Sequence, residues 1–249
     1  MNASDVIIES LHARVSVRAF TDDPISAEDE RTILEAACQA PTAGNQQLYT
    51  IIVVRDPDKR KALAESCDHQ PFIAKAPLVL VFCADVRRWH RAFTAAQGCE
   101  PRDPGVGDAL LACADAAIAA QNAVVAAQAL GIGSCYIGDI IENAETQREI
   151  LALPDYVMPA CMLVMGHPTE QQLRRQKPRR FDLDTVVCVD NYRDAPEDEL
   201  LEAIGDKLRG GAESISAFCN RKWNSDFSRE MTRSANIWLD GFPFEDVAH

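Results

Sequence analysis

The stretch from Asp108 to Leu130 constrains the fold more than any other part of the sequence. It is alanine-rich, apolar on nearly every side and long enough for about six helical turns, and Gly131 follows it as a C-terminal cap. Asp108, Asp115 and Asn122 leave one narrow polar stripe, which we expect to be solvated or to lie at an interface. Such a helix must be buried on most sides, so the chain has to build a core around it.

Four segments have the composition of strands that could form this core. They are rich in β-branched and other apolar residues, and they cover residues 48–54, 77–84, 134–138 and 158–166. The first two are continuously hydrophobic, which is typical of buried central strands, and we expect them to pair in one sheet. Residues 185–192, TVVCVDNY, are a final strand candidate.

Helices are expected around these strands. The sequence predicts them over residues 4–12, from the N-cap Ser26 to near Pro41, over 142–151 and over most of 196–240. Between 85 and 107 the sequence mixes charges and aromatic residues with Gly and Pro, and we expect a loop that leaves the core.

Composition excludes several classes of function. A net charge of −13 argues against a nucleic-acid binder or a partner of anionic membranes. The nine cysteines form no C-x-x-C pair, so we interpret them as reduced core residues, and the five histidines fit no metal-ligand spacing. Without a signal-peptide pattern or a stretch of membrane hydropathy, the sequence predicts a cytoplasmic protein that binds neither membrane nor metal.

Two groups of basic residues suggest an anion site. In HARVSVRAF, an extended backbone would put Arg14, Ser16 and Arg18 on one face. In QLRRQKPRRF, five basic residues crowd into a strongly acidic chain, at Arg174, Arg175, Lys177, Arg179 and Arg180. Either these groups are simply solvated, or the two segments together hold a mononucleotide phosphate.

Two further segments could approach a flat ligand. APTAGNQQ combines hydrogen-bonding side chains with small residues that leave its backbone accessible: Thr42, Ala43, Gly44, Asn45 and Gln47. In GIGSCYIGD the glycines precede a strand, which argues against a dinucleotide-binding fingerprint, but Gly138 and Asp139 could present a backbone N–H to a ring nitrogen. Each segment is also consistent with an ordinary polar turn.

Six short segments resemble, in order, those of the nitroreductase family of FMN-dependent NAD(P)H oxidoreductases: RVSVRAF, APTAGNQQ, HQPFIAKAPLVLVFCAD, YIGDIIEN, MGHPT and KPRRFDLDTVV. The resemblance implies an α+β fold with a central mixed or antiparallel sheet flanked by helices, in an intertwined homodimer with FMN at the subunit interface. It implies an FMN-binding domain over residues 1–195 and a helical C-terminal extension over 196–249, similar to that of the larger, frequently NADPH-preferring members.

The resemblance also assigns flavin contacts. Arg14 and Ser16 match positions that hold the FMN phosphate and ribityl chain, Arg18 matches a basic position near the N1/O2 edge of the ring, and Val15 stands where many members carry a basic or histidine residue. The other assigned contacts lie in later segments, namely Thr42, Ala43, Asn45 and Gln47 from the partner chain, Gln70 at the pyrimidine side, Ile137, Gly138 and Asp139 beside N5, and Lys177 and Arg179 in a second phosphate clamp.

The implied reaction needs no catalytic side chain. NAD(P)H, either NADPH or NADH, gives hydride to N5 of FMN and leaves, and an electrophilic acceptor of the nitroaromatic, quinone or flavin class then takes it, in a ping-pong cycle. Reduced flavin is negative around N1 and O2, so Arg18 would act as an electrostatic stabiliser. Candidates to cover the flavin are Phe72, Trp89, Phe93 and Trp223, and candidates for the NADPH 2′-phosphate are Arg221 and Lys222.

Plain packing of these aromatic residues and plain solvation of the basic pair stay open as alternatives. Two other functions are also open at this point. One is an FMN-binding sensor or carrier without turnover, or a protein that remodels flavin itself. The other is an interaction module whose basic loop binds an acidic partner.

Overall fold

The computed structural model describes residues 3–242, which divide into two compact units. The first unit contains the described residues up to Arg175 and those from Met231 onward, and the second is Gln176–Glu230. The expected FMN-binding domain over residues 1–195, followed by a helical extension over 196–249, stays a prediction.

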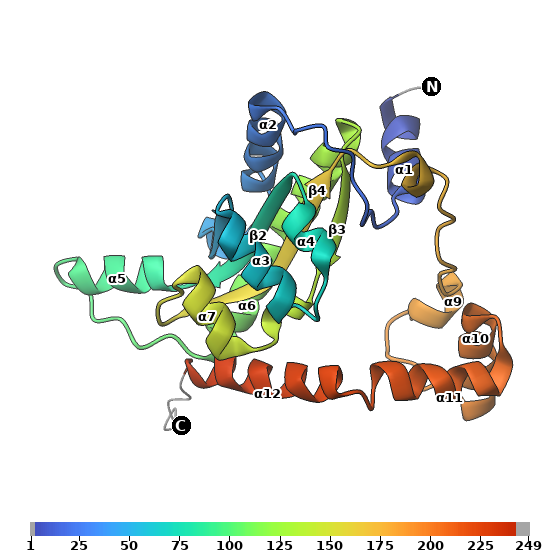
Figure 1. Ribbon diagram of the computed structural model, residues 1–249. Helices are drawn as coiled ribbons and strands as arrows, with labels where there is room; N and C mark the ends of the chain where they lie inside the picture. The colour runs from blue at the N-terminus through green and yellow to red at the C-terminus, as the bar shows by residue number, and fades with distance from the viewer. Residues whose placement is uncertain (1–2, 243–249) are drawn as a thin grey trace. The chain divides into compact units, whose positions relative to one another are not determined.

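The first unit is built on a four-stranded antiparallel sheet in the order β1-β2-β4-β3 (Figure 1). The strands are β1 Tyr49–Val53, β2 Leu78–Asp85, β3 Gly133–Ile137 and β4 Val157–Gly166. The expected pairing of the first two strands is confirmed, with Thr50 opposite Cys83. The expectation that both are central is wrong for β1, which lies at the edge of this sheet, whereas β2 is buried along its whole length.

Helices lie on both faces of the sheet, as the two cores below show. The helices of the first unit, apart from α12 (Asp226–Asp240), are α1 Ala3–Ala13, α2 Ala27–Cys38, α3 Pro57–Ser66, α4 Pro71–Lys75, α5 Arg87–Ala95, α6 Val106–Ala129, α7 Ala144–Leu151 and α8 Glu170–Leu173, with the short 3-10 helices η1 Ala43–Asn45 and η2 Asp139–Ile141. The predicted start of α2 is confirmed, because the Ser26 hydroxyl accepts the Asp29 N–H at 3.0 Å and donates to the Asp29 carboxylate at 2.8 Å.

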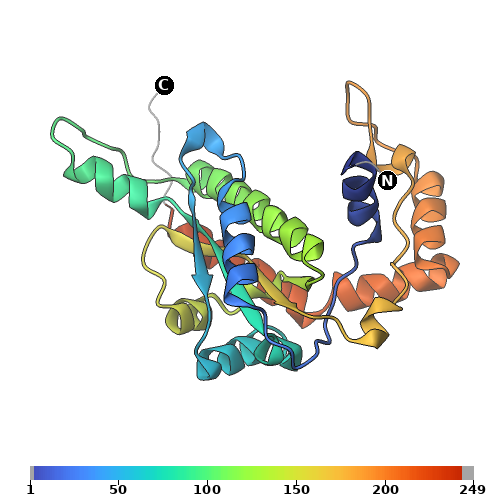
Figure 2. The ribbon, with the colours of Figure 1, turned by 90° about the horizontal axis from the view of Figure 1, so that it is seen from above.

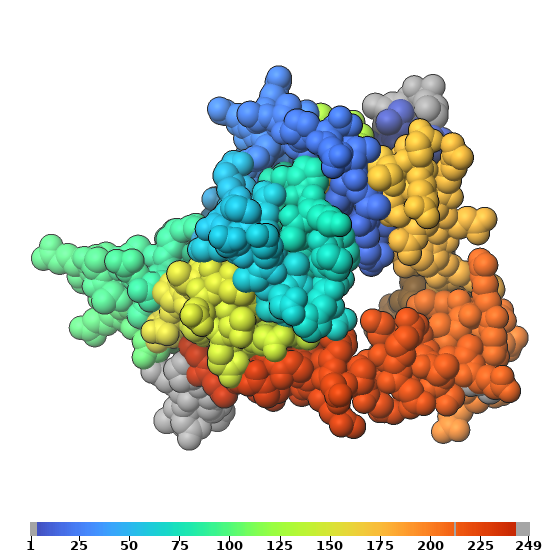
Figure 3. Space-filling view, in the orientation of Figure 1, coloured from blue at the N-terminus to red at the C-terminus, as the bar shows by residue number. Residues whose placement is uncertain are grey.

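Successive side chains of β2 point to opposite faces of the sheet, and each face has its own hydrophobic core. On one face Leu80 and Phe82 pack with α2 and α6, which lie side by side in Figure 2. On the other face Val79 and Val81 pack with residues of α3, α4, α7 and the C-terminal part of α12 (Asp226–Asp240), among them Trp238, which is fully buried. Figure 3 shows α3 and α7 adjacent on this side, where the Gln147 amide donates to the Ser66 hydroxyl at 3.0 Å.

Helix α6 is long and apolar enough to cross a membrane, so the expectation that no stretch has this property is wrong. In this fold α6 is a core helix. The alanines on one side of it, among them Ala116, Ala120 and Ala123, are buried against the sheet and α2, because small side chains let the helix approach closely. Gly131 has φ 74° directly after the helix, as the predicted cap requires. The cytoplasmic location stays a prediction.

The second unit contains α9 Leu183–Val186, α10 Glu197–Leu208 and α11 Gly211–Lys222. Residues 185–192 do not form the expected strand. Val189 is 82% exposed and Tyr192 is 88% exposed, and the segment pairs with none of the four strands of the described sheet. Strand-forming composition is realised only where a sheet edge is there to pair with.

The segment from 85 to 107 contains the helix α5, which the expected loop did not include. Nor are all cysteines core residues. Cys67, Cys83, Cys135 and Cys161 are buried and Cys113 is half-buried, but four others are exposed, namely Cys38, Cys99, Cys188 and Cys219.

Candidate functional site

The Arg14–Arg18 segment lies beside β3. The Val17 N–H donates to the Ser134 carbonyl at 2.9 Å, and Ser16 forms a single parallel bridge with Ser134 rather than a continuous strand. Gly133 makes this approach possible, because a Cβ atom there would lie 2.6 Å from a methyl carbon of Val17. The close contact fixes the position of the side chains on either side of Val17.

Four predicted site residues influence the pKa of the Cys135 thiol. Burial raises the pKa of this thiol, Arg18, Ser16 and Arg14 each lower it, and Asp139 raises it. Such influences act over short distances. The segment 14–18 and the end of β3 therefore form one polar cluster, although the sequence interpretation did not include Cys135.

Gln70 joins this cluster from a different part of the chain. Its side-chain amide donates to the Asp139 carboxylate and, at 2.9 Å, to the Cys67 carbonyl. The indole of Trp238 donates to the Ile141 carbonyl at 2.9 Å and so holds the η2 turn from the opposite side. These contacts bring the predicted residues Gln70 and Asp139 together.

The cluster offers features that suit a phosphorylated planar ligand. Nη1 of Arg14 is buried and has no hydrogen-bond partner within the described residues, and a buried guanidinium nitrogen is costly unless an anion accepts its hydrogen bond. The Arg18 side chain is exposed. Gly138 is exposed too, and a Cβ atom built on it would meet nothing within 4 Å, so the backbone beside it is open.

The turn that carries Thr42, Ala43, Asn45 and Gln47 packs on a different part of α6. Asp115 accepts the N–H groups of Ala43 at 2.9 Å and Leu48 at 3.2 Å. Asp115 is only 3% exposed, so the expectation that this polar stripe is solvated or interfacial is wrong at this position. A carboxylate in the middle of an apolar helix was the sequence signal for a buried polar contact.

Within a single chain, this turn does not reach the Arg14 cluster. The polypeptide leading into that cluster lies near the far end of α6, where the Gln128 amide donates to the Ser10 carbonyl. Asp115 and Gln128 are roughly 20 Å apart along the helix axis at 1.5 Å per residue. The two groups of predicted flavin contacts therefore occupy separate places in the chain.

Lys177 and Arg179 belong to the second unit. There the Arg179 guanidinium donates to the Asp206 carbonyl at 3.1 Å and lies 3.7 Å from its carboxylate, while Lys177 is half-buried. The expected meeting of these residues with Arg14 stays a prediction. Arg221 and Lys222 are exposed in the same unit, and each lies near an aromatic ring. Trp223, in the same unit, is 80% exposed.

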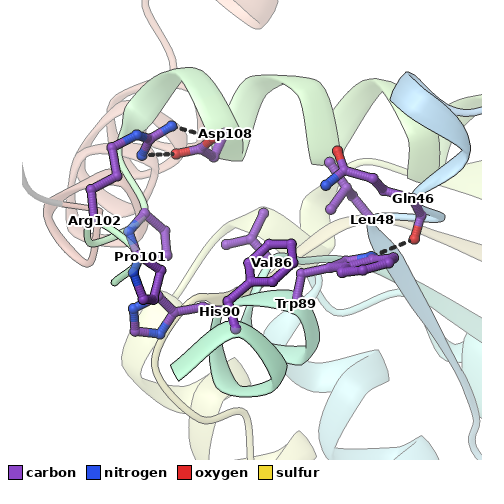
Figure 4. A pocket seen from close by; sticks show the side chains of 10 residues that line it. Gln46, Leu48, Val86, Trp89, His90, Pro101, Arg102 and Asp108 are labelled. Atoms are coloured by element: carbon purple, nitrogen blue, oxygen red, sulfur yellow. Dashed lines mark hydrogen bonds and ion pairs between the residues drawn. The ribbon is translucent and has the colours of Figure 1, made fainter. Parts of the chain in front are cut away.

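An apolar pocket of about 320 Å³ lies between α5 and the start of α6 (Figure 4). The rings of Trp89 and Phe93, with centroids 5.3 Å apart, form part of its wall, and the Trp89 indole donates to the Gln46 carbonyl at 2.7 Å. At the other side Arg102 forms two hydrogen bonds to the Asp108 carboxylate, at 2.6 and 2.9 Å. The remaining flavin-covering candidate, Phe72, packs against the core.

No group of three or more His, Cys, Asp or Glu side chains is arranged to hold a metal ion among residues 3–242.

Comparison with known proteins gives a consistent result. The model of the Nitroreductase family matches residues 11–167. An FMN reductase [NAD(P)H] of Bacillus subtilis is 33% identical over 229 residues, covering 92% of this chain and 88% of the relative. An oxygen-insensitive NADPH nitroreductase of Salmonella typhimurium is 35% identical over 201 residues, covering 80% and 79%. The structure of an NADPH:FMN oxidoreductase from Vibrio harveyi complexed with NAD+ has a TM-score of 0.77 at 26% identity, covering 94% and 97%.

Proposed function

The chain belongs to the nitroreductase family, and on that premise we propose that it is an FMN-dependent NAD(P)H oxidoreductase that reduces a small electrophilic acceptor. The cluster around Arg14 carries this proposal. A buried guanidinium nitrogen without a partner, a hydroxyl at Ser16 and open backbone at Gly138 together fit the phosphate and ring of FMN.

The protein's part in the reaction is to bind and orient. Arg14 and Ser16 would hold the phosphate and ribityl chain, and the exposed guanidinium of Arg18 would face the edge of the ring where negative charge develops. Gln70 and Asp139, joined by their hydrogen bond, would present polar groups to the pyrimidine side and the neighbourhood of N5. FMN supplies two-electron hydride transfer when bound, and we expect donor and acceptor to use it in turn.

A neutral aromatic acceptor fits the pocket between α5 and α6 best. Its wall includes Gln46 and Leu48, which adjoin the turn assigned to the flavin. Its arginine, Arg102, is paired with Asp108, and its histidine, His90, lies 3.4 Å from the Asp103 carboxylate, so both basic side chains of the lining already face an acidic one. We therefore favour nitroaromatic or quinone acceptors over phosphorylated ones. For an NADPH donor, Arg221 and Lys222 are the candidates that would meet the 2′-phosphate.

We infer a homodimer from the exposed face of α6. Leu111, Ile118 and Val125 recur every seven residues and are 53%, 41% and 37% exposed, so they form an apolar stripe that no part of residues 3–242 covers fully. A second copy packed antiparallel across a two-fold axis near Gln121 would cover this stripe with itself. It would also place the turn at Asp115 of one copy opposite the region near Gln128 of the other, close to that copy's Arg14 cluster.

The proposal is tested with purified protein. We expect the protein to be yellow or to quench added FMN, and anaerobic NADPH or NADH to bleach the flavin absorbance rapidly. A protein that neither retains nor quenches FMN would refute the proposal. Binding of FMN without bleaching by either donor would instead support a sensor or carrier, and unchanged flavin content after Lys177→Ala with Arg179→Ala would support an interaction role for the basic loop.

The dimer is tested separately. Ile118→Glu places a charge in the apolar stripe, and we expect it to yield monomers on size exclusion that no longer retain FMN. A monomer that still binds FMN tightly would contradict the assignment of the turn to the second copy.

A further inference from the structure

Asp115 is a buried carboxylate that the proposed hydride transfer does not use. Both of its oxygens are engaged by backbone, Oδ1 by the Ala43 N–H at 2.9 Å and Oδ2 by the Leu48 N–H at 3.2 Å. These two amides stand at the two ends of the turn. Asp115 thus accepts a hydrogen bond from each end of the turn, and its helix is itself packed in the core.

The turn between those amides has a backbone conformation that needs external support. Asn45 and Gln47 have φ of 57° and 52°, in the left-handed region that non-glycine residues seldom adopt, and Gly44 has φ 55°. Such residues persist where the surrounding structure over-determines them. The Thr42 hydroxyl accepts the Gln47 N–H at 3.1 Å, but this contact lies within the turn and cannot fix it on the molecule.

We propose that Asp115 is a positioning residue that fixes the turn 42–48 for contact with the flavin of the second copy. The inference rests on the proposed function, which assigns that turn to FMN. A carboxylate suits the task because each oxygen accepts an N–H, whereas an amide side chain accepts at only one. From the other side, the Trp89 indole donates to the Gln46 carbonyl at 2.7 Å, so the turn is hydrogen-bonded to both α6 and α5.

The first test replaces Asp115 by asparagine. Asp115→Asn keeps the side-chain shape but sets an N–H against one backbone N–H, so the turn loses one of the two hydrogen bonds that Asp115 accepts from it. We expect the FMN dissociation constant, measured by quenching of FMN fluorescence, to rise about tenfold or more. Trp89→Phe removes the indole N–H at the opposite side, together with part of the ring, and should raise the FMN dissociation constant severalfold, which provides a second variant should Asp115→Asn fail to fold.

Asn122→Ala is the matched control. Asn122 lies seven residues later on the same polar stripe, and its amide donates at 3.2 Å to the Ala36 carbonyl, which belongs to α2 rather than to the turn. We expect both α6 variants to lower the melting temperature of the FMN-free protein, but only Asp115→Asn to weaken FMN binding. Equal FMN affinity in Asp115→Asn and wild type, or equal weakening in both variants, would overturn the inference.

Mixed dimers test whether the turn acts on the second copy. A dimer of one Arg14→Ala subunit and one Asp115→Asn subunit contains one site with both defects and one with neither if the turn acts across the interface. We then expect half of the FMN sites to bind with wild-type affinity. Two weakened sites would overturn the inference, whereas wild-type protein that binds no FMN at all would overturn the proposed function itself.

Discussion

Gly133→Ala is the substitution with the most direct structural consequence for the proposed site. The added Cβ would lie 2.6, 2.9 and 3.0 Å from three atoms of Val17, a stiff β-branched side chain that cannot turn away. Ordinary carbon contacts are about 3.5–4.0 Å, so Val17 would have to retreat by roughly 1 Å. That movement stretches the 2.9 Å hydrogen bond from Val17 to Ser134 beyond a useful length and carries Ser16 and Arg18 with it.

The magnitude follows from these contacts. Overpacking of this kind costs about 1–3 kcal/mol, and a lost backbone hydrogen bond about 1 kcal/mol. Without ligand the segment 14–18 can relax away from β3, so most of the cost appears when FMN draws it back. Since 1.4 kcal/mol is a factor of ten, we expect FMN affinity to fall about 10- to 100-fold, measured by fluorescence titration.

Gly131→Ala is the control for this experiment. Gly131 has φ 74° and no atom within 4 Å of an added Cβ, so alanine there should cost about 1 kcal/mol of stability without disturbing the site. Wild-type FMN affinity in Gly133→Ala would refute the reasoning that Val17 fixes the flavin-binding segment. Weaker FMN binding in Gly131→Ala would show that affinity merely follows stability.

Three further predictions concern the pocket and the thiols. Phe93→Ala should raise KM for a nitroaromatic or quinone severalfold while leaving FMN affinity unchanged; a change in FMN affinity would place Phe93 at the flavin instead. A thiol reagent at neutral pH should label the exposed Cys38, Cys99, Cys188 and Cys219 rapidly in the native protein and the buried thiols only after unfolding. Burial raises the pKa of Cys67, Cys83 and Cys161 to about 12, so the native state holds these protons more tightly than the unfolded state, in which thiols ionise at roughly 8.5. Stability from this source is complete below that pH and is lost as pH rises toward 12, which urea unfolding at successive alkaline pH values would detect.

The sequence predicted the core elements because their patterns are local. The all-round apolar helix, the four strands and the Ser26 cap each depend on side chains within a few residues of one another. The strand predicted over 185–192 does not form, because its valines meet no sheet edge. Helix α5 was not predicted, because its apolar residues, Trp89 and Phe93, stand among charged ones. Long-range pairing is what local composition does not contain.

The same distinction separates what could be predicted of the site. Arg14, Ser16 and Asp139 could be proposed because their segments have recognisable patterns; that all three influence the pKa of the Cys135 thiol is consistent with one cluster, and their role at a flavin stays a prediction. Asp115 was assigned to a solvated or interfacial stripe, because a seven-residue recurrence tells which face of a helix is polar but not what that face meets. Its partners, the amides of Ala43 and Leu48, lie 72 and 67 residues away in the chain.

Helix α6 links flavin binding to dimerisation if the proposed function holds. One face packs on the sheet, Asp115 holds the turn assigned to the neighbouring flavin, and Ile118, one helical turn further on, lies in the exposed apolar stripe. A rigid helix cannot shift at the stripe without shifting the turn. FMN, by engaging one copy's Arg14 cluster and the other copy's turn, would therefore stabilise the dimer by mass action, and the midpoint of dimer dissociation should move to lower protein concentration as FMN is added.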